Sequence, residues 1–349
     1  MYTEADLQSA VTAGVISHEA ADALRAHAVG LRSAPSVDEE HFRLITGFND
    51  IFVTIAAVLL LVAMGGIGQA IAPGLAGALI AAAAWGMAEF FTARRRMALP
   101  SIVLLLAFVG GLVAAPIELL AENGANLTDR TGTLVAAAIA LFAAGGTWLH
   151  WLRFMVPITV AAGTAALVAM VLALIAAALM PLFPHDGEVV MMPLAFASGL
   201  AVFTLAMRWD MSDRKRETRR SDVAFWLHLL AAPLIAHPLF HAIGVTEGEN
   251  IAPAAAIGVI AIYMAMGVVA LAVDRRALLV SALAYVLVAM TMLLRQFDAV
   301  ELNVALTGLV IGSALLTLSA FWTPIRHWVV DQLPQRLRSL VPETGLLRA

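Results

Sequence analysis

Long apolar stretches separated by short polar turns dominate the chain from residue 51 onward. A helix needs about 20 apolar residues to cross a bilayer, and these stretches have about that length. They predict ten membrane spans at approximately 51–70, 74–92, 99–120, 132–151, 155–181, 190–208, 222–243, 252–273, 277–294 and 301–322. The predicted fold class is therefore all-α, a polytopic membrane protein with about ten transmembrane helices.

The first 45 residues are polar and follow a helical pattern of their own. Thr3 begins a capping-box pattern, Gly14 is suited to end a first helix, and Ser17 can cap a second. We therefore expect a cytosolic helical hairpin and linker over 1–45, a transmembrane domain over 46–328 and a cytosolic tail over 329–349. The hairpin is a candidate docking element for a protein partner.

The turns between the apolar stretches alternate in charge. Arginines mark one set: Arg94, Arg95, Arg96, Arg153, Arg208, Arg214, Arg275, Arg276 and Arg326. Acids mark the other set, with only Arg130 and Arg295 against them: Glu122, Asp129, Asp186, Glu188, Glu247, Glu249, Asp298 and Glu301. Because short basic loops stay on the cytoplasmic side, the pattern predicts a multi-pass protein of the bacterial inner (cytoplasmic) membrane with both termini in the cytoplasm.

Composition agrees with this interpretation and excludes several classes of protein. Hydrophobic residues make up 61% of the chain and charged residues 13%, where a soluble domain would carry roughly a quarter charged residues. The chain has no cysteine, which excludes disulfides and thiolate sites. It has no basic domain for nucleic acid and no recognisable nucleophile or phosphate-binding motif. The lipid bilayer is the predicted partner, and we assign no catalytic residue.

Two parts of the chain carry the same markers in the same order. In each part an acid begins a span, Ile-Ala-Pro follows at the next turn, and arginines follow at the turn after it. The markers are Asp50, Ile71-Ala72-Pro73 and Arg94-Arg95-Arg96 in the first part, and Asp222, Ile251-Ala252-Pro253 and Arg275-Arg276 in the second. They indicate a parallel repeat of spans 1–4 and 7–10, although hairpins in any alanine-rich membrane chain could share such markers.

The stretch 222–243 carries the most unusual chemistry. Pro233 and Pro238 each remove a backbone hydrogen bond, which predicts a broken helix. His237 and His241 are four residues apart and share a helix face, while His228 lies nearer the start. His237 and His241 are therefore candidate metal ligands. The alternative is that the histidines bind backbone carbonyls released by the prolines.

Four acids within or beside the spans are further candidates for a ligand site or proton pathway, since ionisable groups there are costly. Glu118 follows Pro116 and could be a third metal ligand or a proton carrier. Glu89 lies near Arg94, which suggests an ion pair between them. Asp50 and Asp222 begin spans, where an acid can cap a helix without any further role.

The N-terminal segment resembles that of a family of bacterial membrane proteins of unknown function, in which a short cytosolic hairpin precedes several spans. The matching residues are Asp6-Leu7, Ala13-Gly14-Val15-Ile16-Ser17, Glu19-Ala20 and Ala23-Leu24. The resemblance implies a membrane location and this topology, and brings no substrate, cofactor or catalytic residue.

Three functions remain open from the sequence. The first is a transporter or permease for a small solute or ion, which predicts that polar groups on spans 1, 3 and 7 line one cavity. The second is a non-transporting sensor, assembly factor or scaffold. The third is a membrane-embedded metal or haem protein that uses His228, His237 and His241. The sequence identifies no cofactor.

Overall fold

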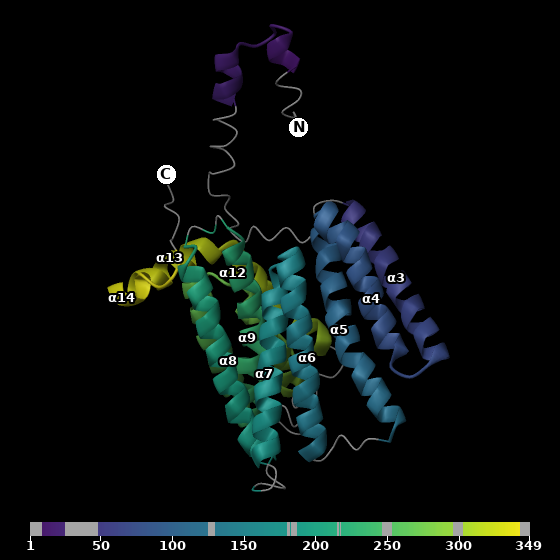
Figure 1. Ribbon diagram of the computed structural model, residues 1–349. Helices are drawn as coiled ribbons and strands as arrows, with labels where there is room; N and C mark the ends of the chain where they lie inside the picture. Colours follow the sequence, from purple (N-terminus) through teal and green to yellow (C-terminus); the bar gives the residue numbers. More distant parts are fainter. Residues whose placement is uncertain are drawn as a thin grey trace. The chain divides into compact units, whose positions relative to one another are not determined.

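The computed structural model describes residues 9–24, 48–124, 130–179, 182, 187–214, 216, 218–245, 253–295 and 303–342. Every regular element in these ranges is a helix (Figure 1), which confirms the all-α prediction. The chain forms two compact units. The larger comprises Arg43–Glu343, and the smaller comprises Met1–Phe42 with Thr344–Ala349.

The smaller unit contains two short helices, over residues 9–12 and 18–24, within the range of the predicted hairpin. Gly14 has a φ of 70° and lies two residues after the end of the first helix, where the amide of Val15 donates to the carbonyl of Ala10 at 2.9 Å. The Ser17 hydroxyl accepts from the amide of Ala20 at 3.1 Å and caps the second helix. Both predicted helix ends are therefore confirmed. Thr3 lies outside the described residues.

The larger unit is a series of helices joined by short connections. Their bounds are α3 (Phe48–Ile71), α4 (Leu75–Ala88) continued by the π-helix η1 (Glu89–Arg94), α5 (Ala98–Glu122), α6 (Arg130–Phe154), α7 (Ile158–Leu179), α8 (Gly187–Met211), α9 (Arg219–Ala242), α10 (Pro253–Val273), α11 (Ala277–Arg295), α12 (Asn303–Ala320), α13 (Trp322–Gln332) and α14 (Gln335–Arg338). By length and composition, seven of them, from α3 to α9, can cross a membrane. The protein is a helical membrane protein, and the count of ten crossings stays a prediction.

The turns at the two ends of the bundle differ in backbone chemistry. At one end, which we call the basic end, the turns after η1, α6, α8 and α10 each contain a non-glycine residue with positive φ. These residues are Arg96, Met155, Arg216 and Asp274, with φ between 51° and 58°. At the other end, the turns after α3, α5 and α9 use Gly74, Gly124 and Gly244. Because the turns after α6 and α8 share the feature with those after η1 and α10, it does not single out the proposed repeat, which stays a prediction.

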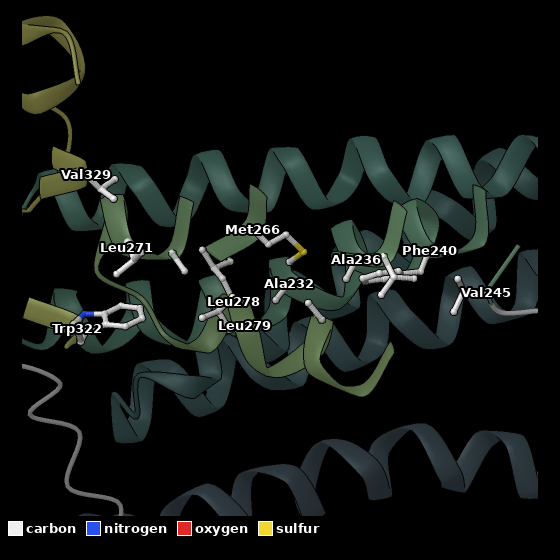
Figure 2. Packing of buried hydrophobic residues seen from close by; sticks show 13 residues of the cluster. Ala232, Ala236, Phe240, Val245, Met266, Leu271, Leu278, Leu279, Trp322 and Val329 are labelled. Carbon is white, nitrogen blue, oxygen red and sulfur yellow. The ribbon is translucent and has the colours of Figure 1, made fainter. Parts of the chain in front are cut away.

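Helix α9 lies at the centre of the packing. It contacts α7, α8 and α11, and half of its apolar segment is buried, against 17–33% for the apolar segments of the other long helices. A core of buried side chains runs along it, from Phe240 and Val245 at one end to Trp322 and Val329 at the other (Figure 2). Residues on α9 are therefore well placed to form interior contacts.

Helix α9 continues through both of its prolines, so the predicted break at Pro233 and Pro238 is wrong. Helix α8 approaches closely at this level. A Cβ added to Gly199 would lie 2.9 Å from the backbone carbon of Leu234 and 2.8 Å from a side-chain carbon of Ile235. The carbonyl of Leu234 is one that Pro238 deprives of its amide partner. At the level of the prolines, helix α9 is therefore continuous and α8 packs closely against it.

The predicted boundary at residue 328 divides residues that the structure packs together. Trp322 and Val329 of α13 are both part of the core around α9 and α10 (Figure 2). The larger unit continues to Glu343. Apolar side chains on α13 therefore fasten the start of the predicted tail to the bundle.

Candidate functional site: a buried charge network at the basic end

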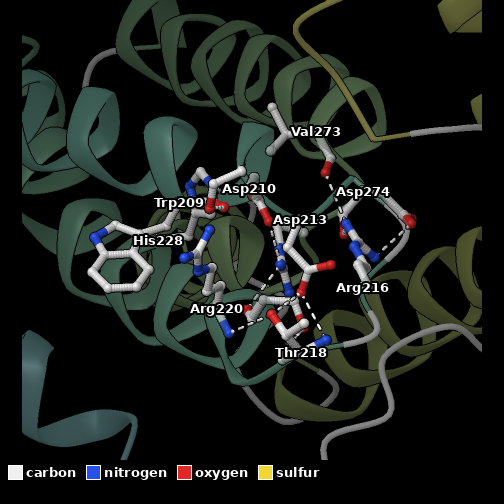
Figure 3. Close-up of polar contacts among 12 residues, drawn as sticks. Trp209, Asp210, Asp213, Arg216, Thr218, Arg220, His228, Val273 and Asp274 are labelled. Atoms are coloured by element: carbon white, nitrogen blue, oxygen red, sulfur yellow. Dashed lines mark hydrogen bonds and ion pairs between the residues drawn. The ribbon is translucent and has the colours of Figure 1, made fainter.

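Charged side chains with little solvent exposure gather at the basic end of the bundle (Figure 3). They come from the end of α8, the α8–α9 turn, the third turn of α9, the α10–α11 turn and α13. The members of this buried charge network are Asp210, Arg216, His228, Asp274, Arg275, Trp322 and Arg326. The network joins elements far apart in the sequence.

Asp210 is the centre of the first half of the network and is 1% exposed. Arg275 donates from Nη2 to Oδ1 at 2.5 Å and from Nε to Oδ2 at 3.3 Å. His228 Nε2 lies 2.9 Å from Asp210 Oδ2. Arg275 also donates to the carbonyl of Ser221 at 3.0 Å, which ties the α10–α11 turn to the first turn of α9. Both carboxylate oxygens of Asp210 are thus engaged.

His228 is 0% exposed, and its position fixes which ring nitrogen carries a proton. A carboxylate can only accept hydrogen bonds, so His228 must present an N–H at Nε2 to Asp210. Neutral His228 therefore has a lone pair at Nδ1. That atom is buried and has no hydrogen-bond partner within the described part of the chain. A buried nitrogen that can accept a proton and is left without a partner calls for an explanation.

Asp274 is the centre of the second half. Arg216 donates from Nη1 to Oδ2 at 2.8 Å, the Trp322 indole N–H donates to Oδ1 at 2.8 Å, and Arg326 Nε lies 3.5 Å from Oδ1. Burial alone would raise the pKa of Asp274. The positive charges of Arg216 and Arg326 and the indole hydrogen bond outweigh it and lower the pKa below its ordinary value.

Local backbone geometry places Asp274 and Arg275. The amide of Asp274 donates to the carbonyl of Leu271 at 3.3 Å, and that of Arg275 donates to Ala270 at 2.9 Å. These two bonds form a Schellman motif at the end of α10, with Asp274 at the left-handed position that glycine usually takes. Aspartate tolerates this conformation better than most residues. The motif thus places Asp274 beside Arg216 and the adjacent Arg275 beside Asp210.

The network also reaches the α8–α9 connection and the last described residues. Asp213 Oδ2 accepts from the amide of Thr218 at 2.9 Å and from its hydroxyl at 2.6 Å, and Thr218 in turn caps α9. Arg326 donates to the carbonyl of Pro342 at 3.0 Å, and Arg214 donates to that of Val341 at 3.2 Å. These contacts link the α8–α9 connection and α13 to residues 341–342 at the basic end.

The predicted pair of histidines lies on α9 toward the other end of the bundle. His237 is exposed, and its Nδ1 lies 2.6 Å from the Tyr285 hydroxyl on α11. The rings of His237 and His241 are 6.5 Å apart between centroids. In the described ranges, no three histidine or acidic side chains come together as a metal site would need. A metal at His237 and His241 stays a prediction. The described residues supply no third ligand beside them.

The predicted acids are spread over separate contacts. Glu118 is half-buried on α5, with Oε2 3.5 Å from the amide of Gly77 on α4. Glu89 forms a two-pronged ion pair with Arg153 of α6, at 3.0 and 2.5 Å, so the suggested pairing with Arg94 is wrong. The π-helix η1 begins at Glu89 and ends at Arg94. Glu89 and its partner are both solvent-exposed at the side chain.

Asp50 and Asp222 both lie inside the first turn of their helices and do not precede them, so neither is the cap that the sequence suggested. Asp50 is buried and Asp222 is half-buried. The N-cap of α9 is Thr218, whose hydroxyl accepts from the amide of Arg220 at 3.2 Å. A negative charge in the first turn still interacts favourably with the helix dipole.

The predicted polar groups of spans 3 and 7 contact three different helices. Glu118 contacts α4, His237 contacts α11, and His228 contacts α8. Of the candidate ligand and proton-pathway residues, His228 alone belongs to the buried charge network as defined above. Sequence reasoning missed Asp210, Asp274 and the binding roles of the arginines. The available signal was an aspartate within the basic turns themselves, as in Asp274-Arg275.

A second buried histidine provides a comparison for His228. His150 on α6 is 1% exposed, and its Nδ1 lies 3.3 Å from the Thr159 hydroxyl. The rings of Trp85, Phe108 and Phe154 surround it, with centroids 4.5–5.8 Å away. His150 thus sits among aromatic rings, whereas His228 touches a carboxylate that an arginine also binds.

Comparisons of the chain with protein-family models, with curated proteins and with solved structures found no match. The resemblance to hairpin-bearing bacterial membrane proteins therefore stays a prediction.

Proposed function

We propose that the chain is a transporter for a small solute or ion, and that His228 holds a proton during its cycle. The observation that carries this proposal is the buried His228–Asp210–Arg275 contact, with Nδ1 of His228 open to a proton. The proposal places the protein in the inner membrane of a bacterium, with ten spans, both termini in the cytoplasm and the basic end inward.

The position of the network supports a functional role. Ionisable groups inside a membrane protein are costly and commonly mark ion or proton pathways. Asp210 and His228 lie on helices that are apolar enough to cross a membrane. A buried ion pair is also weak evidence of added stability, since its desolvation cost offsets much of the Coulomb attraction.

Protonation of His228 would change the contacts of its neighbours. Neutral His228 offers Asp210 one dipolar N–H, whereas the imidazolium offers a full positive charge. The charged ring then competes with Arg275 for the same carboxylate, because it adds a Coulomb attraction that the neutral ring lacks. A weaker Asp210–Arg275 contact loosens the link between α8 and the α10–α11 turn. Proton binding can thereby alter helix packing, as transport coupling requires.

The test is charge movement by protein reconstituted in liposomes on a solid-supported membrane. The probes are alkali cations, amino acids, carboxylates, amines and sugars, each applied with and without a pH gradient. We expect one class to give transient currents that depend on the gradient. His228→Gln retains a side-chain donor for Asp210 but cannot take up a proton, so it should abolish the dependence on pH. His150→Gln, at the other buried histidine, is the matched control and should retain it.

Two results would contradict the proposal. Currents in His228→Gln with the wild-type pH dependence would remove His228 from the coupling. Wild-type currents equal to those of empty liposomes for every probe would remove transport itself.

The second candidate is a non-transporting scaffold or assembly factor. It is favoured by the hydrogen bonds from Arg326 and Arg214 to the carbonyls of Pro342 and Val341. These bonds give the basic end of the bundle a structural role. This alternative predicts a stoichiometric partner that co-purifies through the N-terminal hairpin and is lost when residues 1–45 are removed.

A further inference from the structure

Residues 331–340, which we call the α14 loop, are held at both ends to the basic end of the bundle. Before the loop, α13 packs against α10, with Trp322 buried in the core. After it, Val341 and Pro342 are buried. Arg214, just after α8, donates to the carbonyl of Val341 at 3.2 Å, and Arg326 donates to that of Pro342 at 3.0 Å. The loop is therefore held near the level at which α8 and α10 end.

The α14 loop presents leucine side chains outward. Each of its residues is exposed except Leu333, which is half-buried. Leu337 is 47% exposed and Leu340 is 42% exposed. The amide of Leu340 donates to the carbonyl of Leu337 at 3.0 Å, so these two leucines lie in one turn of the chain. They form a small apolar patch that the bundle does not cover.

The same loop is positively charged, since residues 332–342 include Arg336 and Arg338 and no acid. Arg338 donates to the carbonyl of Leu333 at 3.0 Å and lies 3.6 Å from the carboxylate of Asp331, which partly compensates its charge. Arg336 is exposed, and its side chain forms no hydrogen bond or ion pair within the described part of the chain. Leucines beside an uncompensated cation are typical of segments that lie at a membrane surface.

Helix α13, which leads into the loop, has a matching arrangement. With 11 residues it is too short to cross a bilayer. Trp322, Arg326 and Val329, spaced four and three residues apart, are buried on the stripe that faces the bundle. Trp328 lies off this stripe and is 65% exposed. Because tryptophan is enriched at headgroup level in membrane proteins, Trp328 indicates that α13 lies at the boundary between lipid and water.

We propose that α13 and the α14 loop form an interfacial segment on the membrane surface at the basic end, with Leu337 and Leu340 among the acyl chains and Arg336 at acidic phospholipid headgroups. This places the described part of the predicted cytosolic tail on the bilayer. The inference is independent of transport and applies equally to a scaffold.

Two observations identify lipid as the partner. The first is position. Arg214 reaches the carbonyl of Arg338, the last residue of α14, at 3.5 Å, so α14 ends beside α8 (Figure 1). Met211, at the end of α8, is itself an exposed apolar side chain on a helix that can cross a membrane, so the loop continues a surface that faces lipid. The second is charge, because basic segments next to a span are attracted to acidic lipids.

The test uses the absence of cysteine, because each introduced cysteine then carries the only nitroxide label. Leu337→Cys, Leu340→Cys and Gln335→Cys are labelled in the full chain and reconstituted in vesicles of phosphatidylglycerol and phosphatidylcholine. Power saturation compares collisions with oxygen, which concentrates in the bilayer, and with a nickel chelate, which stays in water. Labels at 337 and 340 should favour oxygen. The label at Gln335, two residues from Leu337 and so on another side of α14, should favour nickel.

A second measurement tests the headgroup contact through the label at Leu340, whose spectrum separates membrane-bound from mobile populations. Arg336→Gln should lower the ratio of bound to mobile label in the phosphatidylglycerol vesicles about fivefold, which corresponds to about 1 kcal/mol for one arginine at an anionic surface. Arg336→Lys should keep most of the binding. Arg95→Gln is the matched control, because Arg95 is also exposed at the basic end but follows η1, which contacts α4 and α5. It should leave the ratio unchanged.

Three results would overturn the proposal. Equal access of nickel to the labels at 335, 337 and 340 would place the α14 loop in water. Protection of the labels at 337 and 340 from both oxygen and nickel would mean that protein covers them, either a second copy of the chain or a partner. Equal losses in Arg336→Gln and Arg95→Gln would mean only a general attraction between the basic end and acidic lipid. Each variant is first checked for wild-type helical content and elution volume.

Discussion

Replacing Arg275 with methionine tests whether Asp210 and Arg275 form a true buried ion pair. The change removes the guanidinium and leaves Asp210, which is 1% exposed, with His228 as the remaining partner in the network. Removing one partner of a buried pair costs about 3–5 kcal/mol, because an uncompensated charge stays inside the protein. We therefore expect Arg275→Met to lower the free energy of unfolding by about this amount.

A second ion pair in the same chain provides the control. Arg153 and Glu89 are also in close contact, at 2.5 Å, but their side chains are 53% and 37% exposed. Solvent screens such pairs, and their measured contributions are about 0–1 kcal/mol. Arg153→Met should therefore have a small effect. The two variants remove the same chemical group from pairs that differ mainly in burial.

The assay is equilibrium unfolding in mixed micelles of mild detergent and dodecyl sulfate, followed by circular dichroism. Asp210→Asn combined with Arg275→Met removes both charges while an amide oxygen still accepts from His228. The double variant should recover more than half of the loss caused by Arg275→Met alone. If Arg275→Met costs no more than Arg153→Met, or if the double variant is as unstable as the single one, the reasoning about burial is refuted.

Two further predictions use the same unfolding assay. A Cβ at Gly77 would lie 2.4 Å from a backbone nitrogen of α5, so Gly77→Ala should cost about 1–3 kcal/mol by overpacking. Gly86→Ala on the same helix meets nothing within 4 Å and should be neutral or stabilising; equal effects would contradict the close contact. Because the folded pKa of Asp274 lies below its ordinary value of 3.8, its carboxylate stabilises the fold above about pH 4, and this contribution is lost as the pH falls toward the folded pKa. Asp274→Asn should flatten the fall in stability on the acid side, and an unchanged slope in the variant would assign that fall to other acids.

The helices could be predicted from the sequence because apolar length is a local property. The run around residues 99–120 became α5, and Gly14 and Ser17 end and cap helices as their chemistry indicates. The prolines of α9 misled because a helix can lose two hydrogen bonds and continue when a neighbour such as α8 packs against it.

The site was harder to predict because its partners are distant in sequence. Arg275 Nε contacts Asp210 across 65 residues, and nothing local in the turn after α10 indicates that partner. From the sequence, Arg275 and Arg326 are interpreted as topology signals, a role that needs no particular contact. Glu89 shows the same limit. Arg94 was near in sequence, but α6 brings Arg153 across 64 residues to form the pair.

The 65-residue separation between Asp210 and Arg275 also bears on how the protein is made. At about 5–20 residues per second, a ribosome needs roughly 3–13 s to proceed from one to the other. During that interval Asp210 has been made and Arg275 has not. The charge network can therefore be completed only late in synthesis. Arg275 and Trp322, which bind Asp210 and Asp274, are made after α8 and α9.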